Sequence, residues 1–168
     1  MSVMRTSESA VGSRNEEGID FGELPPAVDA LLQQGVVAYR RSPLEAEARF
    51  RQALELAPRT LPVYFCLYKI HTYQGNLDGA LAAALAGLEE AASQAGRSPA
   101  FEEWPQGDDG SDQAVRFALY TLKALAFIRM KRGELPEAGR ILARLALLDP
   151  KGRVGWPVVN DLLQGLSS

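Results

Sequence analysis

The stretch AEARFRQALELAP, residues 46–58, decides the fold of this chain of 168 residues, because its pattern returns further along the sequence. Its apolar positions recur every three or four residues and therefore share one face of a helix: Ala46, Phe50, Ala53, Leu54 and Ala57. The polar residues between them are predicted to face away: Glu47, Arg49, Arg51 and Gln52. Ser42 and Pro43 suit the N-cap and the first position of this helix, and Pro58 ends it.

The alanine near the start of this helix returns at a regular spacing. Ala80 follows Ala46 by 34 residues, and Ala138 occupies the same place in a third copy. Gly75 and Gly133, each at the end of a preceding helical stretch, stand five residues before the second and third of these alanines. The first and third copies also close alike, with LELAP and ALLDP. The sequence therefore contains a repeated unit of two helices joined by a tight turn.

A period of 34 residues with two helices per unit resembles the tetratricopeptide repeat family. The second helix of that family has a small, a bulky and again a small residue, followed by proline, and the first copy matches throughout with Ala46, Phe50, Ala53 and Pro58. The later copies depart from this pattern at Ala84, Ala92 and Leu145. The resemblance implies a right-handed superhelix of antiparallel helix pairs, in which the small residues Ala46, Ala53, Ala80, Gly87 and Ala138 allow close helix packing.

The whole chain is expected to be all-α, with about seven helices and no alternating strand pattern. Residues 1–24 are predicted to be a disordered polar tail, and residues 25–168 a single repeat domain. The repeats span about residues 27–60, 61–94 and 115–150, with an insertion loop at 97–112. A capping helix over residues 157–165 is expected to turn four apolar side chains inward, anchored by Trp156: Val158, Val159, Leu162 and Leu163.

Composition and charge exclude several classes of protein. The net charge of −3 gives no general attraction to nucleic acid or to anionic membranes. A single cysteine, Cys66, excludes an internal disulfide and favours a reducing compartment. No stretch reaches the roughly 18 apolar residues that a membrane span needs, and the polar N-terminal sequence has no secretory signal. We therefore expect a cytoplasmic protein with no nucleic-acid or membrane partner.

The residues that carry most catalysis are scarce in this sequence. His71 is the only histidine, which leaves no basis for a histidine metal site or a Ser-His-Asp triad, and it is expected to be a structural side chain. Cys66 lies in an apolar run and is expected to be a small buried hydrophobe. The acidic loop GDDGSD has the wrong spacing for a calcium loop. The sequence predicts a non-catalytic protein with no cofactor and no metal.

The family resemblance implies that the first helix of each unit lines a concave surface that binds a peptide or a partner protein. By the repeat register, the groove would be lined by Tyr39, Arg40, Phe65, Lys69, Tyr73, Tyr120, Lys123, Phe127 and Lys131. Aromatic side chains interleaved with lysines suit an acidic partner with apolar anchors. In the alternative interpretation, Phe65 and Phe127 belong to the core and the lysines form a solvated face. The asparagines of the family's clamp for chaperone carboxyl termini are absent from these positions.

The insertion offers a second candidate surface. Phe101 and Trp104 are large apolar residues set among acids in PAFEEWPQGDD. They could dock on a partner, or they could pack back onto the protein in the groove, since a freely exposed tryptophan is unusual in a monomer.

Residues 113–163 resemble the small tetratricopeptide proteins encoded with bacterial nitrogen-fixation systems. This resemblance implies an accessory protein that docks on the nitrogenase molybdenum–iron protein during assembly, maturation or protection, and holds no cluster itself. Two alternatives stay open. One is a generic scaffold or secretion-type chaperone that holds an extended acidic and aromatic peptide in the concave groove. The other is an enzyme or regulator whose chemistry lies in the insertion.

Overall fold

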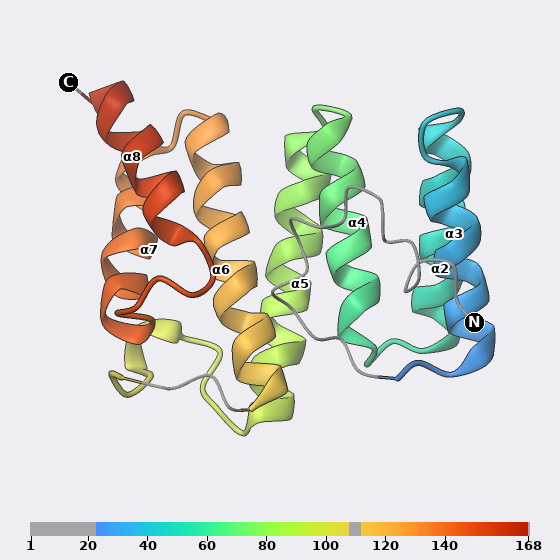
Figure 1. Cartoon of the computed structure of the whole chain (residues 1–168), viewed down its shortest axis with the longest axis horizontal. Coiled ribbons are helices and arrows are strands. Elements are labelled where there is room, and N and C mark those ends of the chain that lie inside the picture. The colour runs from blue at the N-terminus through green and yellow to red at the C-terminus, as the bar shows by residue number, and fades with distance from the viewer. Residues whose placement is uncertain (1–22, 108–111, 168) are drawn as a thin grey trace.

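The computed structural model describes residues 23–107 and 112–167, and every regular element in these residues is helical (Figure 1). The predicted all-α class is therefore confirmed for this part of the chain, whereas residues 1–22 of the predicted tail and 108–111 of the predicted insertion lie outside the described residues. The helices, in chain order, are α2 Pro26–Ala38, α3 Pro43–Leu56, α4 Leu61–Tyr73, α5 Leu77–Ala95, the short 3-10 helix η2 Phe101–Glu103, α6 Gln113–Lys131, α7 Leu135–Leu148 and α8 Trp156–Ser167.

The helix starts follow the local chemistry of the sequence. Ser42 caps α3 as predicted, because its hydroxyl accepts a hydrogen bond of 3.2 Å from the amide of Glu45. Thr60 holds the capping position of α4 but makes no such bond. An N-cap side chain accepts from the amide two or three residues later. Here the first of these residues is Pro62, which has no amide hydrogen, and the amide of the second, Val63, donates to the Thr60 carbonyl at 3.1 Å. Thr60 therefore occupies the N-cap position of α4 without a side-chain cap.

Two of the helix pairs are joined by the same turn. Gly75 between α4 and α5 has φ +77°, and Gly133 between α6 and α7 has φ +84°, a region that L side chains rarely adopt. The amide that follows each glycine, in Asn76 and in Glu134, donates a hydrogen bond of 2.9 Å to the carbonyl five residues earlier. The glycines that recur in the sequence at 75 and 133 thus form turns with the same backbone conformation and the same hydrogen bond. The turn between α2 and α3, residues 39–42, contains no glycine.

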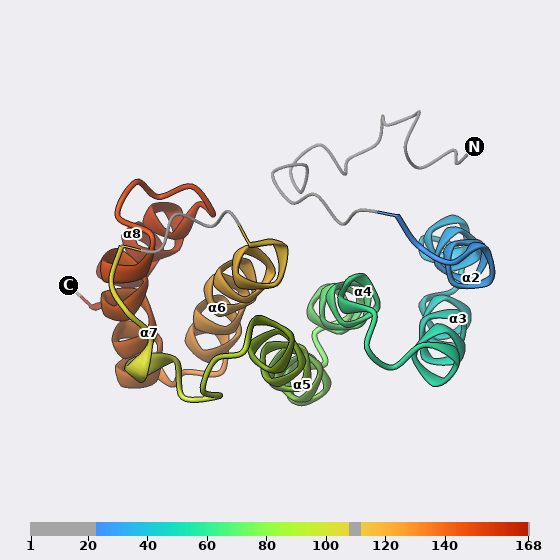
Figure 2. The ribbon, with the colours of Figure 1, turned by 90° about the horizontal axis from the view of Figure 1, so that it is seen from below.

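The helices form two layers. Seen along the helix axes, α2, α4, α6 and α8 make up one layer and α3, α5 and α7 the other (Figure 2). The first layer is concave, because α4 is set back between α2 and α6 (Figure 2). Two hydrophobic clusters fill the interior: one joins α2, α3 and α4, and the other runs from α4 to α8. Cys66 on α4 and Ala83 on α5 pack against both clusters.

Small residues set the distance between the layers. The four alanines that the repeat places at helix crossings are fully buried: Ala46, Ala53, Ala80 and Ala138. Gly87 on α5 lies so close to α4 that a methyl carbon added to it would be 2.9 Å from Cβ of Tyr64. Gly35 on α2 is packed in the same way against the ring of Phe50, at 2.3 Å. These contacts confirm that the small side chains allow close packing.

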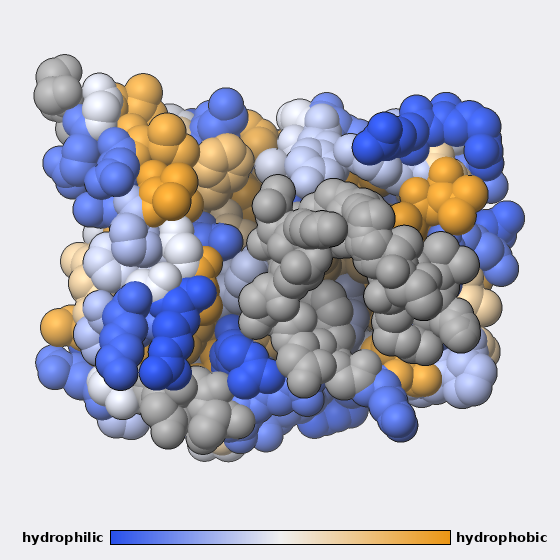
Figure 3. All heavy atoms as spheres, in the orientation of Figure 1, coloured by the Kyte–Doolittle hydropathy of each residue, from blue (hydrophilic) through white to orange (hydrophobic). Residues whose placement is uncertain are grey.

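The C-terminal helix corrects one prediction. Val159 and Leu163 are buried, but Val158 and Leu162 are 65% and 49% exposed. Residues 158 and 162 share a helical face that is rotated away from the face of 159 and 163, and a terminal helix packs one face only. Figure 3 shows the resulting apolar surface over α8. Trp156 anchors this helix as predicted, because its Nε1 donates a 2.8 Å hydrogen bond to the carbonyl of Asp149.

The contact at Gly87 gives a prediction about stability. Gly87→Ala should lower the free energy of unfolding by about 1 to 2 kcal/mol, because overpacking costs about 1–3 kcal/mol and alanine recovers only about 0.5–1 kcal/mol in a helix. Urea unfolding followed by circular dichroism measures the change. Gly165→Ala on α8 is the matched control, since nothing lies within 4 Å of that position. A Gly87→Ala protein as stable as this control would contradict close packing.

Candidate functional site

One set of aromatic and lysine side chains runs across the concave layer. Phe65, Lys69 and Tyr73 recur every four residues on α4, so they project from one face of that helix. Tyr120 and Lys123 lie on one face of α6, and Tyr39 follows the last residue of α2. We call these six residues the aromatic–lysine row.

The row is continuous from α2 to α6. The ring centroids of Tyr39 and Tyr73 are 5.6 Å apart, and the Lys69 ammonium lies over both Tyr73 and Phe65, at 5.1 and 5.6 Å. The rings of Phe65 and Tyr120 are 5.7 Å apart, and the ammonium of Lys123 lies 4.1 Å from the centre of the Tyr120 ring. Distances of this size are those of aromatic packing and cation–π contacts.

The members of the row differ in burial. Phe65 and Tyr120 are each only 8% exposed and belong to the core, as the alternative interpretation expected for Phe65. Tyr73 is 58% exposed, and Tyr39, Lys69 and Lys123 are half-buried. The less buried part of the row therefore consists of two tyrosines and two lysines, resting on two core rings.

The other predicted groove residues lie outside the row. Phe127 and Lys131 form a separate pair near the end of α6, with the ammonium 6.0 Å from the ring centre. Phe127 is half-buried and Lys131 exposed. Arg40 is exposed in the turn after α2, next to Tyr39.

A buried polar contact, which the sequence pattern did not predict, supports the row from beneath. The hydroxyl of Tyr68 on α4 lies 3.2 Å from Oγ1 of Thr121 on α6, and both residues are buried. Burial raises the pKa of Tyr68 above its ordinary value, so the phenol is neutral. Its ring packs edge-on against Phe65 at 5.6 Å. This contact fixes the register of α4 against α6. In the sequence, the contact is marked only by two hydroxyl-bearing residues, Tyr68 and Thr121, that stand in otherwise apolar stretches.

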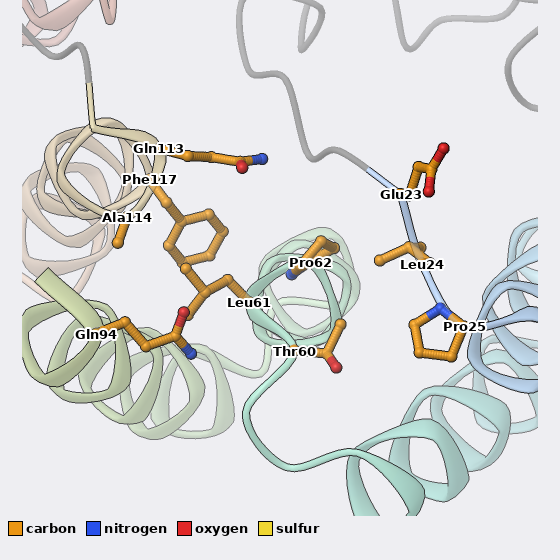
Figure 4. Close-up of a pocket in the computed structure, with 10 residues that line it drawn as sticks. All are labelled: Glu23, Leu24, Pro25, Thr60, Leu61, Pro62, Gln94, Gln113, Ala114 and Phe117. Carbon is orange, nitrogen blue, oxygen red and sulfur yellow. The ribbon is translucent and has the colours of Figure 1, made fainter.

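A pocket of about 230 Å³ adjoins the row at the start of α4 and α6. Figure 4 shows Gln113 and Phe117 on one side, Glu23 and Leu24 on the other, and Pro62 between them. The complete lining is Glu23, Leu24, Pro25, Thr60, Leu61, Pro62, Gln94, Gln113, Ala114 and Phe117. Its floor is apolar and its rim polar, so it has the character of a site for one apolar side chain. The repeat pattern did not predict this pocket, because its walls come from four separate segments.

The insertion packs onto the protein rather than standing clear of it. Trp104 is buried, its Nε1 donates a 2.7 Å hydrogen bond to the Ser98 carbonyl, and the guanidinium of Arg97 lies 5.3 Å from its ring centre. Arg144 on α7 donates to the carbonyls of Phe101, at 3.4 Å, and of Trp104. Both carbonyls bond to α7, an outer-layer helix, so these two residues pack back onto the protein at α7 and not in the groove.

The single histidine is a packing residue at the junction of α3 and α4. His71 is 2% exposed, and its Nδ1 accepts a hydrogen bond of 3.1 Å from Nδ2 of Asn76, whose Oδ1 accepts from Gly79. The neutral ring therefore carries its proton on Nε2, which lies 3.5 Å from Oε2 of Glu47. Burial lowers the pKa of His71, and the Glu47 carboxylate opposes that shift. Glu47 is thus turned partly toward α4, whereas the helical pattern placed it on the outward face.

Within residues 23–107 and 112–167, no three His, Cys, Asp or Glu side chains are grouped as they would be around a metal ion. None of the described helices has the length and apolar character needed to cross a lipid bilayer.

No protein-family model matches this chain, and no curated protein or solved structure matches it either.

The packing of the insertion can be tested at Trp104. Trp104→Ala should lower the free energy of unfolding by about 3–5 kcal/mol, the usual cost of emptying a buried tryptophan site. Trp104→Phe keeps a buried aromatic ring but loses the hydrogen bond to Ser98 and part of the ring volume, so a smaller loss of about 1–3 kcal/mol is expected. Guanidinium unfolding measures both variants. An alanine variant as stable as the parent would show that this side chain is not packed.

The lowered pKa of His71 predicts a pH dependence of stability. The unfolded chain takes up a proton near the ordinary value of 6.5, and the folded protein does so only at lower pH. The folded state thus binds fewer protons, so the contribution of His71 is fully present above about pH 6.5 and is lost as the pH falls below it. His71→Gln should reduce the loss of stability between about pH 7.5 and about pH 5. An equal loss in both proteins would contradict this assignment.

Proposed function

We propose that this chain is a tetratricopeptide-type protein-binding module that holds a segment of a partner protein against the aromatic–lysine row. The observation that carries this proposal is the continuity of the row, in which six side chains on α4, on α6 and directly after α2 form a chain of contacts along the concave layer. These side chains supply aromatic surface, apolar contact and positive charge, all of which are means of binding.

The family assignment is supported by two features that agree with each other. The sequence repeats at 34 residues, and the turns of two helix pairs repeat the same glycine conformation and the same hydrogen bond. In a stacked repeat protein, neighbouring units bury a continuous core and expose one concave surface. The hydrophobic cluster that runs from α4 to α8 agrees with such stacking.

The partner proposed from the resemblance of residues 113–163 is the nitrogenase molybdenum–iron protein, during its assembly, maturation or protection. The alternative is a generic scaffold or a secretion-type chaperone. Both roles would use the same concave surface in the cytoplasm. Affinity capture with the tagged full chain from anaerobically grown nitrogen-fixing cells separates them, because the first predicts nitrogenase subunits and the second predicts an unrelated client.

Tyr73, the exposed tyrosine of the row, gives the sharper test. Tyr73→Ala should weaken binding of the captured partner about tenfold, which corresponds to about 1.4 kcal/mol, because it removes an exposed ring that contacts both Tyr39 and Lys69. Titration calorimetry with the purified partner measures the change. Leu56→Ala on α3 is the matched control, since Leu56 is 57% exposed but lies in the outer layer. Equal affinity of the two variants would exclude the row as the binding surface.

A further inference from the structure

We infer that the N-terminal sequence of this chain is a ligand of its own concave layer, with the ring of Phe21 in the pocket lined by Leu61 and Phe117, and that a partner must displace it. Phe21 itself lies outside the described residues. Its contact with the pocket is independent of the proposed function, whereas the competition with a partner rests on that function.

The N-terminal sequence joins helix α2 along one wall of the pocket. Glu23, Leu24 and Pro25 line this wall, and residues of α6 line the opposite one (Figure 4). Leu24 is half-buried and packs against the hydrophobic cluster of α2, α3 and α4. The residues that precede Glu23 are therefore tethered at the rim of this pocket and not at a distant surface.

Two prolines stiffen this connection. Leu24 and Pro25 each precede a proline, and such residues are confined to extended conformations. Pro25 has φ −56° and ψ 141°, as this restriction requires. The segment that leads out of α2 is thus extended, and the packing of Leu24 fixes its course past the pocket.

The sequence just before Glu23 supplies apolar side chains that suit the pocket. Ile19 and Phe21 alternate with Asp20, so in an extended segment they project to the same side. Phe21 precedes Glu23 by two residues, which is at most about 7 Å of chain. The next branched or aromatic apolar residue toward the N-terminus is Val11, ten residues before Phe21. Phe21 is therefore the aromatic side chain nearest to the pocket along this segment.

The pocket has the size and lining for one such ring. Its volume of about 230 Å³ is smaller than the roughly 300–1,000 Å³ of sites for small-molecule ligands. Leu61 and Phe117 form an apolar floor that is 9% and 2% exposed, with Pro62 and Ala114 beside them. An aromatic ring gains free energy from burial on such a floor and from contact with the ring of Phe117.

The tether favours a side chain of the same molecule over one from outside. A short flexible link gives an effective concentration on the order of millimolar, so even a weak contact is populated within one chain. A side chain of another molecule has no such advantage and must bind through additional contacts.

The lysines of the row point to the same kind of competition. Lys69 and Lys123 each have an interaction partner within the chain besides the rings that they cover. A partner that uses these lysines must replace those contacts, just as a partner that uses the pocket must replace Phe21. Binding at the concave layer would therefore be an exchange of contacts.

Nuclear magnetic resonance of the full-length protein tests the contact directly. In the free protein, nuclear Overhauser effects are expected between the ring protons of Phe21 and the methyl groups of Leu61 and Ala114. Phe21→Ala should shift these methyl resonances and leave those of Val158, on the exposed face of α8, unchanged. Phe21→Leu keeps an apolar side chain and should cause smaller shifts. Val11→Ala is the matched control from the same sequence and should cause none.

The competition is tested with the captured partner. A pocket that is filled about nine times in ten leaves about one tenth of the protein competent, which raises the apparent Kd about tenfold. Phe21→Ala should therefore bind the partner about tenfold more tightly than the parent, and Val11→Ala should bind it equally. Titration calorimetry measures both, after circular dichroism has shown that the variants are folded.

Three outcomes would overturn the contact. One is the absence of any Overhauser effect between Phe21 and Leu61 in the free protein. Another is a dependence of the Leu61 shift on protein concentration, because this would assign the ring to a second copy of the chain. The third is a contact at Leu61 that arises only when the partner is added, which would assign the pocket to a side chain of the partner.

Failure of the competition and failure of the proposed function give different results. Equal partner affinity of Phe21→Ala and Val11→Ala would overturn the competition, even where the Overhauser effects establish the contact. A partner that is indifferent to Tyr73→Ala would overturn the proposed function and would leave the contact of Phe21 with the pocket in place.

Discussion

The arrangement of this protein depends on how closely its helices approach one another, and a few small side chains set that distance. Where Gly87 meets Tyr64 there is no room for even a methyl group, and the buried alanines at 46, 80 and 138 serve the same purpose in each pair. Close pairing makes the layers regular, and regular layers bring α2, α4 and α6 to one surface. Without it, the aromatic–lysine row would not be continuous.

The row shows how one set of residues can serve both the core and a surface. Phe65 and Tyr120 are buried enough to hold α4 and α6 together, and the same rings carry the lysine ammonium groups at the concave face. The neutral Tyr68 beneath them supplies the polar contact that fixes the helix register. Stability and the proposed binding would therefore be coupled, since Phe65 carries Lys69 and Tyr120 carries Lys123.

Periodicity predicted the helices well, because caps, glycine turns and apolar spacing are local properties of the sequence. It also placed Tyr39, Lys69, Tyr73 and their neighbours on α6 along one layer. It was wrong about Val158 and Leu162, because the face that a terminal helix buries depends on neighbours that no local pattern specifies. The pocket and the docking of Trp104 on α7 were missed for the same reason, since each joins segments far apart in the chain.

The division of the core into two clusters has a mechanical consequence. The cluster of α2 and α3 meets the rest of the protein through α4, so this helix pair is the natural unit to separate first when the protein is stretched or locally unfolded. Tyr39 lies on the separable side and Lys69 on the other. A segment bound to both Tyr39 and Lys69 would span the boundary between the two clusters. Its residence time would then depend on how often α2 and α3 separate from α4.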